Sequence, residues 1–333
     1  MNLLNYIRKE FLNEYFEENE KERRDLSTKM EQDKKYKTII YQKDEKNPYI
    51  VYIILNRPDK NNAISVGPGE MTDEVQDAVH RANRDDDVKV VIYKGNGKNF
   101  CAGYDLSMVY RVYGGSPEIR PLQSKRLQVD FDHIAGLPRT LILCNKVTIA
   151  QIHGWCIEAG MYFAECADIA ISTKDAKIAH RGQRLAFGGQ PFMPFELFLG
   201  HTKKITEMLI TGRTVSGEEA EQMGLVTKAV EPEELEEVVN NLAEAITLLP
   251  RDCIVMGKMR RRFSYELMGA INLTIHPVFH TLSTNLHYAE DEKELMFLRD
   301  REKMGEREAF QKLHEAFDRA LDRTKYFRSY GRK

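Results

Sequence analysis

The sequence predicts an α/β protein with a charged helical extension at its N-terminus and a helical region at its C-terminus. Between about residues 36 and 230, short runs rich in Ile, Val and Tyr alternate with segments whose apolar residues recur at helical spacing. Such alternation is typical of stacked βαβ units with parallel strand pairing. Residues 1–35 are rich in Glu, Lys and Arg, and the chain after Pro232 has helical spacing almost to its end.

The first of three predicted parts is residues 1–35. Its apolar side chains Leu4, Ile7, Phe11 and Tyr15 are spaced as on one face of a helix. We expect an amphipathic helix that lies against the body of the protein or a neighbouring subunit. A partly frayed charged tail is the alternative for so charged a segment.

The second part is an α/β core, residues 36–230. Apolar runs bounded by turn-forming residues predict its strands, which we place at 38–42, 49–56, 88–95, 147–154 and 168–173. Apolar residues at helical spacing predict its helices, which we place at 70–86, around 122–136, from Glu158 onward and over 203–224. Within the last of these, Thr214–Glu218 offers a hydroxyl followed by an acid as a helix cap.

The third part, residues 231–333, is predicted to be helical. Long helices are expected over 235–249 and 293–321. No internal repeat and no low-complexity linker divides the chain.

Composition excludes several classes of protein. The chain has 333 residues and a formal net charge of −2, which gives no electrostatic reason to expect nucleic acid or an anionic membrane as a partner. None of the five cysteines forms a C-x-x-C pair, so we expect reduced thiols and no zinc or other metal site. No signal peptide and no run of about 18 apolar residues is present. We therefore expect a soluble, cytoplasmic protein.

Two segments carry the chemistry. Neither a dinucleotide fingerprint, a P-loop, a zinc-protease motif nor a serine-hydrolase elbow is present. Instead, N-F-C-A-G-Y-D-L at 99–106 and I-H-G-W-C-I-E-A-G-M at 152–161 each place small residues directly after a strand. Backbone N–H groups at such a turn and such a helix start can converge on one oxygen anion. Either segment alone is more often only a turn.

Four motifs in order resemble the crotonase (enoyl-CoA hydratase/isomerase) superfamily. L-N-R-P-D-K-N-N-A-I-S at 55–65 is similar to the family loop N-R-P-x-x-x-N-A, and N-F-C-A-G-Y-D-L to F-[SCA]-A-G-x-D-L. The segment from Ile152 resembles N-G-x-x-x-G-G-G, and L-I-T-G-R-T-V-S-G-E-E-A-E-Q-M-G-L-V at 209–226 resembles L-T-G-x-x-x-x-A-x-E-A-x-x-x-G-L-V. The resemblance extends from about Tyr36 to about residue 320.

The resemblance implies a crotonase-like spiral of ββα repeats, with the helical C-terminal part forming trimers that often pair into hexamers. It implies an acyl-CoA substrate and no separate cofactor, because the substrate carries the coenzyme A. The thioester oxygen would lie between the backbone N–H groups of Tyr104 and Ala159. The CoA entrance would be lined by Lys60, Asn61 and Ala63, although Lys60 could equally be a solvated loop charge.

The same resemblance assigns further CoA-binding positions to the two segments, namely Ala102, Gly103, Asp105, Leu106, Trp155 and Ile157. Asp105 has an alternative role, since an aspartate at that place could cap the following helix.

The sequence departs from the family at both glutamates that a hydratase uses to hold and deliver water. The first position is Tyr162 and the second is Gly182. Candidate replacements are Glu158 and His180, which we favour as the catalytic pair, followed by Tyr162. Each has a structural alternative: Glu158 could pair with an Arg, Tyr162 could pack in the core, and His180 could be a hydrogen-bonded structural histidine.

Two arginines follow His180. Arg181 and Arg184 could hold a carboxylate or carbonyl of the distal acyl group, or form ion pairs at a subunit contact. Trp155, Phe187 and Tyr110 are available to line an acyl pocket.

Three functions fit these residues. The leading one is an enoyl-CoA hydratase-type lyase acting on a cyclic or aromatic-derived acyl group. The second is an isomerase, C–C hydrolase or ring-closing enzyme that uses the same enolate. The third is a non-catalytic CoA- or RNA-binding member, against which stands the lack of a broad basic surface; the local basic cluster Lys258, Arg260, Arg261 and Arg262 is more simply a helix face or a neighbour of the CoA phosphates.

Overall fold

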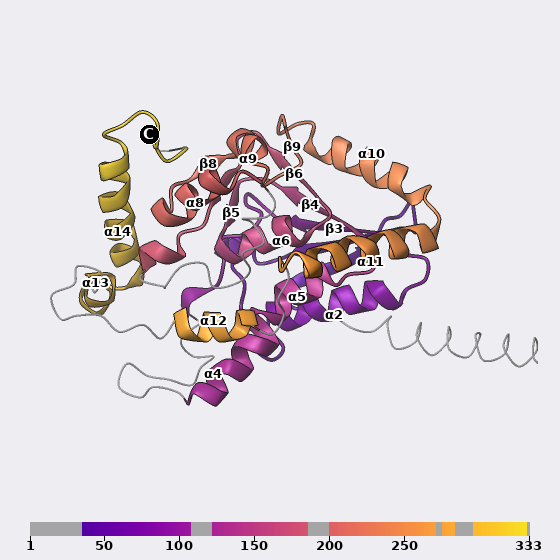
Figure 1. Cartoon of the computed structure of the whole chain (residues 1–333), viewed down its shortest axis with the longest axis horizontal. Coiled ribbons are helices and arrows are strands. Elements are labelled where there is room, and N and C mark those ends of the chain that lie inside the picture. Colours follow the sequence, from indigo (N-terminus) through magenta and orange to yellow (C-terminus); the bar gives the residue numbers. More distant parts are fainter. Residues whose placement is uncertain (1–34, 108–121, 186–199, 271–274, 284–295, 332–333) are drawn as a thin grey trace, which may run out of the picture. The chain divides into compact units, whose positions relative to one another are not determined.

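The computed structural model describes residues 35–107, 122–185, 200–270, 275–283 and 296–331 (Figure 1). The predicted N-terminal helix therefore lies outside the described residues. Two compact units are distinguished, Met1–Tyr36 and Lys37–Lys333. The second unit contains both the predicted α/β core and the helices that follow it. Within the described ranges, no helix combines the length and apolarity needed to cross a bilayer.

A six-stranded sheet forms the centre of the second unit, in the order β1-β2-β3-β4-β6-β9. Its strands are β1 (Ile39–Lys43), β2 (Ile50–Leu55), β3 (Val90–Gly95), β4 (Val147–Ile152), β6 (Ile169–Thr173) and β9 (Lys228–Val230). Only the hairpin of β1 and β2 is antiparallel, and every later neighbour pairs in parallel. The register aligns Val90 of β3 with Ile50 and Val147.

A second, three-stranded sheet has the order β5-β7-β8. Its strands are β5 (Trp155–Ile157), β7 (Lys177–Ala179) and β8 (Val215–Ser216). β5 and β7 follow directly after β4 and β6 of the large sheet, so the chain passes from one sheet to the other and then into a helical segment. This repetition is the ββα spiral that the sequence resemblance predicted.

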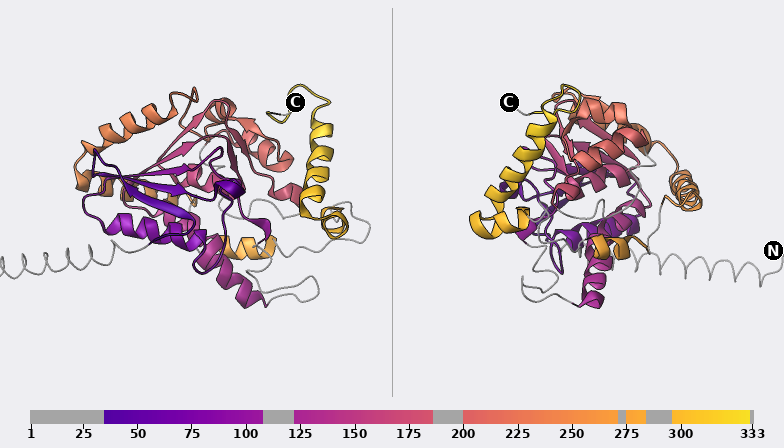
Figure 2. Two further views of the ribbon diagram at one scale, coloured as in Figure 1. Left: turned by 180° about the vertical axis from the view of Figure 1, so that it is seen from behind. Right: turned by 60° about the vertical axis from the view of Figure 1, so that its left-hand side comes forward.

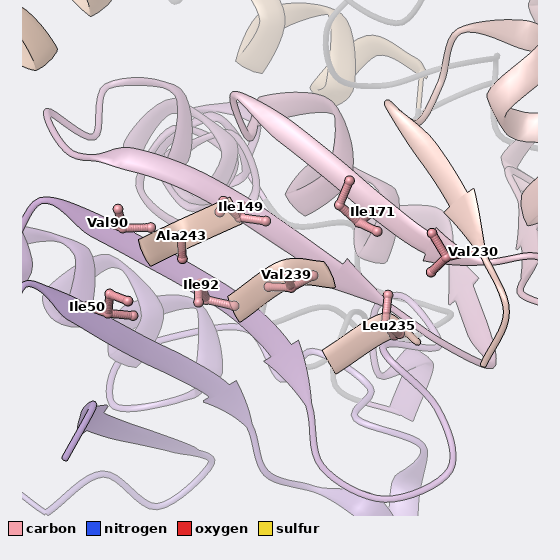
Figure 3. Packing of buried hydrophobic residues seen from close by; sticks show 9 residues of the cluster. All are labelled: Ile50, Val90, Ile92, Ile149, Ile171, Val230, Leu235, Val239 and Ala243. Carbon is pink, nitrogen blue, oxygen red and sulfur yellow. The ribbon is translucent and has the colours of Figure 1, made fainter. Parts of the chain in front are cut away.

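Helices cover both faces of the large sheet (Figures 1 and 2). α10 (Leu235–Thr247) packs on one face through the residues drawn in Figure 3, which are Ile50, Val90, Ile92, Ile149, Ile171, Val230, Leu235, Val239 and Ala243. Tyr93 points to the opposite face because side chains alternate along a strand. There it meets Phe163 of α6 (Met161–Cys166) edge-on at 5.4 Å.

Several further helices complete the layer around α6. They are α2 (Met71–Arg84), α4 (Gln123–Val129), the π-helix η2 (Asp130–Ile134) and α5 (Gly136–Ile142). The described residues also form the short 3-10 helices η1 (Pro58–Lys60), η3 (Glu158–Gly160) and η4 (Gly182–Leu185). α8 (Thr202–Thr211) and α9 (Gly217–Met223) flank the small sheet.

The C-terminal helices are α11 (Arg251–Leu267), α12 (Ile275–Ser283), α13 (Met296–Met304) and α14 (Glu306–Leu321). α11 is fixed to the core by its basic side chains: Lys258 Nζ lies 2.6 Å from Asp168 Oδ2, and Arg262 donates to carbonyl groups at the end of α5. The basic cluster of this helix is therefore largely engaged within the chain. Arg184 of η4 joins α14 through an ion pair of 2.9 Å with Asp318.

Four sequence expectations about helices are corrected. The predicted helix at 203–224 is two helices, because Gly212 adopts a left-handed conformation (φ 59°) and β8 follows. Ser216, not Thr214, caps α9 by accepting from Glu219 N. The segment around 122–136 contains a π-helical turn between α4 and α5, and the long helix at 293–321 is interrupted at Gly305 (φ 88°).

Candidate active site

The first chemistry-bearing segment lies between two other stretches of chain. Cys101 forms an isolated bridge with Cys156 of β5, and Tyr104 forms one with Ile64. In the second bridge, the Gly103 carbonyl accepts from Ile64 N and Asp105 N donates to Ile64 O. The Gly103 carbonyl and the Asp105 N–H thus point toward Ile64. Because Tyr104 lies between them, its own N–H points to the other side of the segment, toward β5 and η3.

The second segment brings a helix start to this edge. β5 ends at Ile157, and η3 and α6 follow without a break. Ala159 is in the first turn of η3, so its N–H has no acceptor within the helix. Glycines allow the two segments to touch: a Cβ on Gly103 would lie 2.8 Å from Glu158 Cβ, and one on Gly160 would lie 2.9 Å from Cys101 O. The structure thus places Tyr104 and Ala159 on facing main-chain segments.

Glu158 stands at the junction and has a strained backbone. Its φ of 50° is in the left-handed region, which is rare for a residue with a side chain and is associated with functional sites. Its side chain is 21% exposed. Oε1 accepts a hydrogen bond from Arg181 N, and Oε2 lies 3.5 Å from His180 Nε2. The structure therefore brings together the two residues that the sequence analysis favoured as a pair.

Gly182 leaves room beside this pair. A Cβ at this position would lie 3.3 Å from His180 Cε1 and 3.7 Å from Glu158 Oε2. The Glu158 carboxylate is thus next to the point where a side chain at position 182 would begin. His180 is almost fully buried, at 2% exposure.

The two tyrosines near the site are less suited to proton transfer. Tyr162 is 1% exposed, and its ring packs edge-on against that of Tyr104 at 6.3 Å. This burial favours the core-packing interpretation of Tyr162. The Tyr104 hydroxyl donates to Ile134 O over 3.2 Å, and burial, with the charge of Asp130, raises the pKa of Tyr104 well above its usual range. Tyr104 is therefore best placed to act through its main chain.

The predicted CoA-entrance loop is held by Asp105. Its Oδ2 lies 2.8 Å from Arg57 Nη2 and 3.4 Å from the half-exposed Lys60, while Oδ1 accepts from Ser107 N and Oγ. Burial raises the pKa of Asp105, but these bonds from Ser107 and Arg57 outweigh it and the pKa is lowered. Asp105 therefore anchors the loop and also caps the chain after it, as the alternative interpretation proposed.

The rest of that loop is tied to the first segment. Asn61 accepts from Ala102 N through its carbonyl and from Asn99 Nδ2 through its side chain, at 3.0 and 2.9 Å. The carbonyl of Ala63 accepts from Arg57 Nη1 at 2.5 Å. Arg57 is a structural residue that the sequence analysis did not single out, although the R of the N-R-P motif marks it.

The remaining predicted lining residues lie along the same two segments. Ala102 and Leu106 are half-buried, and Ile157 is 8% exposed. Trp155 is half-buried, with Lys177 Nζ 5.2 Å and the Arg181 guanidinium 5.7 Å from its ring centre. Phe187 and Tyr110 lie outside the described residues. In the described part of the chain, no three His, Cys, Asp or Glu side chains converge as metal ligands would.

Comparison with known proteins gives a consistent result. A model of the enoyl-CoA hydratase/isomerase family matches residues 45–294. The chain is 29% identical over 216 residues to the peroxisomal Delta(3,5)-Delta(2,4)-dienoyl-CoA isomerase of Arabidopsis thaliana, covering 63% of this chain and 76% of that protein. It is 28% identical over 216 residues to the hydroxycinnamoyl-CoA hydratase-lyase of Pseudomonas fluorescens, covering 64% and 74%.

A solved structure supports the fold. An enoyl-CoA hydratase from Mycobacterium smegmatis superimposes with a TM-score of 0.72 at 24% identity, over 89% of this chain and 98% of that one. Its likeness shows a shared fold over most of the chain.

Proposed function

The chain belongs to the enoyl-CoA hydratase/isomerase family, and we propose that it stabilises the enolate of an acyl-CoA thioester between the N–H groups of Tyr104 and Ala159. Both donors belong to the main chain and are fixed before the substrate arrives. Each such donor contributes on the order of 3–4 kcal/mol to a transition state in comparable oxyanion holes. The thioester carbonyl is thus the electron sink, and the substrate brings the coenzyme A.

The acid–base chemistry is assigned to Glu158 and His180. The observation that carries this proposal is the position of the Glu158 carboxylate, 3.5 Å from His180 and one residue from Ala159. In the resembling family the second hydratase glutamate would be at position 182, where this chain has glycine. The carboxylate of Glu158 lies next to this glycine, so it can act as the acid–base group that residue 182 does not provide.

We propose hydration, or its reverse, as the reaction. One member of the pair removes a proton from water as the water oxygen bonds to the β-carbon, and the other delivers a proton to the α-carbon of the enolate. The lack of the two usual glutamates favours a non-standard acyl group, such as a cyclic or aromatic-derived one. A relative that acts as a hydratase-lyase on hydroxycinnamoyl-CoA is compatible with this choice.

Isomerisation is the second candidate, and a specific observation supports it. Glu158 is the carboxylate that the described residues bring next to Ala159, and a double-bond shift needs one group that removes a proton and returns it at another carbon. A dienoyl-CoA isomerase among the relatives is consistent with this reaction.

A non-catalytic RNA-binding role is less well supported. Lys258, Arg261 and Arg262 form contacts with Asp168 or with backbone carbonyls of the same chain. Lys258 and Arg262 are buried and engaged within the chain, so they do not contribute to an exposed basic patch for phosphates.

Incubation in D₂O with saturated, enoyl and cyclic dienoyl-CoA esters, read by mass spectrometry, tests the proposal. A gain of one water establishes hydration. Deuterium at the α-carbon without addition keeps the enolate mechanism but moves the assignment to isomerisation or C–C chemistry. Binding of CoA esters without exchange or addition would refute the enzymatic proposal.

Assembly into trimers also remains a proposal. α11 exposes an apolar stripe at Met256, Met259, Phe263 and Leu267, whose exposed fractions range from 51% to 72%. Such a stripe is suited to a contact with another chain. Light scattering of the purified protein and of Phe263→Glu would show whether a trimer forms and depends on this face.

A further inference from the structure

Arg181 is a largely buried cation without an ion pair. Its Nη2 donates to Thr214 Oγ1 at 2.7 Å, and its guanidinium lies over Trp155. Across the described ranges, no carboxylate approaches it within 4 Å, and its buried Nε has no hydrogen-bond partner. A buried polar group left in this way requires a reason, since an unmade hydrogen bond in the interior destabilises the fold.

His314 of α14 adds a second unused donor. It is 7% exposed, and burial together with the charges of Arg181 and Arg184 lowers its pKa to about 2, so the ring is neutral. Nδ1 lies 3.4 Å from Arg184 Nη1 and must accept, because a guanidinium has only donors. The proton is therefore on Nε2, which is buried and has no partner in the described part of the chain.

The neighbouring carboxylate is already engaged. Asp318 Oδ1 accepts from Arg184 Nη1 and from Ser329 Oγ, both at 2.9 Å. Its charge and that of Glu158 favour the charged form of Arg181, yet burial prevails and the pKa of Arg181 is lowered. Asp318 is thus bound by Arg184 and Ser329, and among the described residues Arg181 Nε and His314 Nε2 remain buried donors without acceptors.

From these donors we infer that Arg181 Nε and His314 Nε2 form a binding site for an anionic group of the ligand. A carboxylate on the acyl chain would match this site. The main chain of Arg181 donates to Glu158, so the site adjoins the proposed acid–base pair. A guanidinium edge and a neutral imidazole N–H suit carboxylate oxygens. The inference rests on the proposed function and narrows its substrate class to acyl-CoA thioesters that carry a second, free carboxylate.

Calorimetry on the full chain tests the site without requiring turnover. The probes are a saturated acyl-CoA that ends in a carboxylate, its methyl ester, and free CoA. We expect the wild type to bind the carboxylate form about 10- to 100-fold more tightly than the ester, as a charged hydrogen-bonded contact would give. Arg181→Met should remove this preference, and Arg181→Lys should restore part of it.

The matched control is Arg213→Met. Arg213 is buried, as Arg181 largely is, but it is paired with Glu207 and Glu219. This variant should be less stable to heat yet keep the preference for the carboxylate.

Three outcomes would overturn the inference. These are equal affinity for acid and ester in the wild type, an unchanged preference in Arg181→Met, or an equal loss of affinity for free CoA, which would assign the anion to a CoA phosphate. Deuterium exchange at the α-carbon is measured separately. A carboxylate preference without exchange would refute the proposed chemistry and leave the binding site in place. Exchange without the preference would refute the binding site and leave the proposed chemistry in place.

Discussion

Replacing the Glu158 carboxylate by an amide separates its chemical role from its structural one. Glu158→Gln keeps the length of the side chain, and its amide oxygen can still accept the hydrogen bond from Arg181 N. The structural loss is therefore only the difference between a charged and a neutral hydrogen bond, about 1 kcal/mol, and solvent reduces it because the side chain is 21% exposed. The chemical loss should be far larger, since general acid–base groups typically contribute 10²- to 10⁴-fold to a rate.

Activity is measured as deuterium exchange into a CoA ester that the wild type turns over. Stability is measured as the free energy of unfolding in urea. Glu207→Gln is the matched control, because Glu207 is 23% exposed and is also held by an arginine, Arg213. It should lose stability and keep activity. A general base contributes at least about 10²-fold to a rate. If Glu158→Gln retained deuterium exchange within about threefold of the wild-type rate, Glu158 would be a structural carboxylate. The proposal that it replaces the glutamate at position 182 would then fail.

Three further outcomes follow from the geometry. His180→Gln should lower exchange by about 10²-fold or more with CoA binding retained, which stopped-flow turnover and calorimetry can compare. Gly160→Ala should lower activity, because the added Cβ would meet the facing strand at 2.9 Å; Gly257→Ala on exposed α11, where the nearest atom is 3.8 Å away, should instead add about 0.5–1 kcal/mol of stability. Burial raises the pKa of Asp168, but the charge and hydrogen bond of Lys258 outweigh it and the pKa is lowered. The ionised Asp168 should therefore contribute to the free energy of unfolding above pH about 4, and this contribution should be lost as the pH falls through the folded-state pKa. Asp168→Asn should abolish this acid dependence and cost about 3–5 kcal/mol, since Lys258 is left buried at 4% exposure, as urea unfolding at several pH values would show.

The fold was largely predictable because its strands carry a strong local signal. The segments at 38–42, 49–56 and 88–95 are β-branched runs between turn residues, and β1, β2 and β3 lie at these places. Strands of two or three residues such as β5, β7 and β8 have no periodicity to detect, so their sheet could be expected only from the family resemblance. The breaks at Gly212 and Gly305 were missed because a glycine within a helical pattern does not by itself reveal a positive φ.

The candidate site was predictable only in part. Glu158 and His180 are 22 positions apart in the sequence, and the motif order indicated that they would meet, as the structure shows. The surroundings of Arg181 were not predictable, because His314 and Asp318 come from a helix more than 130 residues later. Such long-range partners leave no local pattern. The role of Asp105 as an anchor was likewise visible only once Arg57 was placed beside it.

The arrangement explains how this fold can change its acid–base residues without losing the enolate chemistry. The oxyanion donors belong to the main chain and depend on close contact of the segments at Gly103 and Gly160, so they do not constrain which side chains surround them. Glu158 adopts a left-handed φ of 50° next to Ala159, which costs of order 1–3 kcal/mol for a residue with a side chain. A glycine would avoid this cost. The strain is therefore best explained if the carboxylate is needed at that place, and it is offset by the Arg181 hydrogen bond and by the surrounding core. On this reasoning Glu158→Gly should lose catalysis far more than it loses stability, which deuterium exchange and urea unfolding of the same preparation would show; comparable losses of both would indicate that the residue serves the fold.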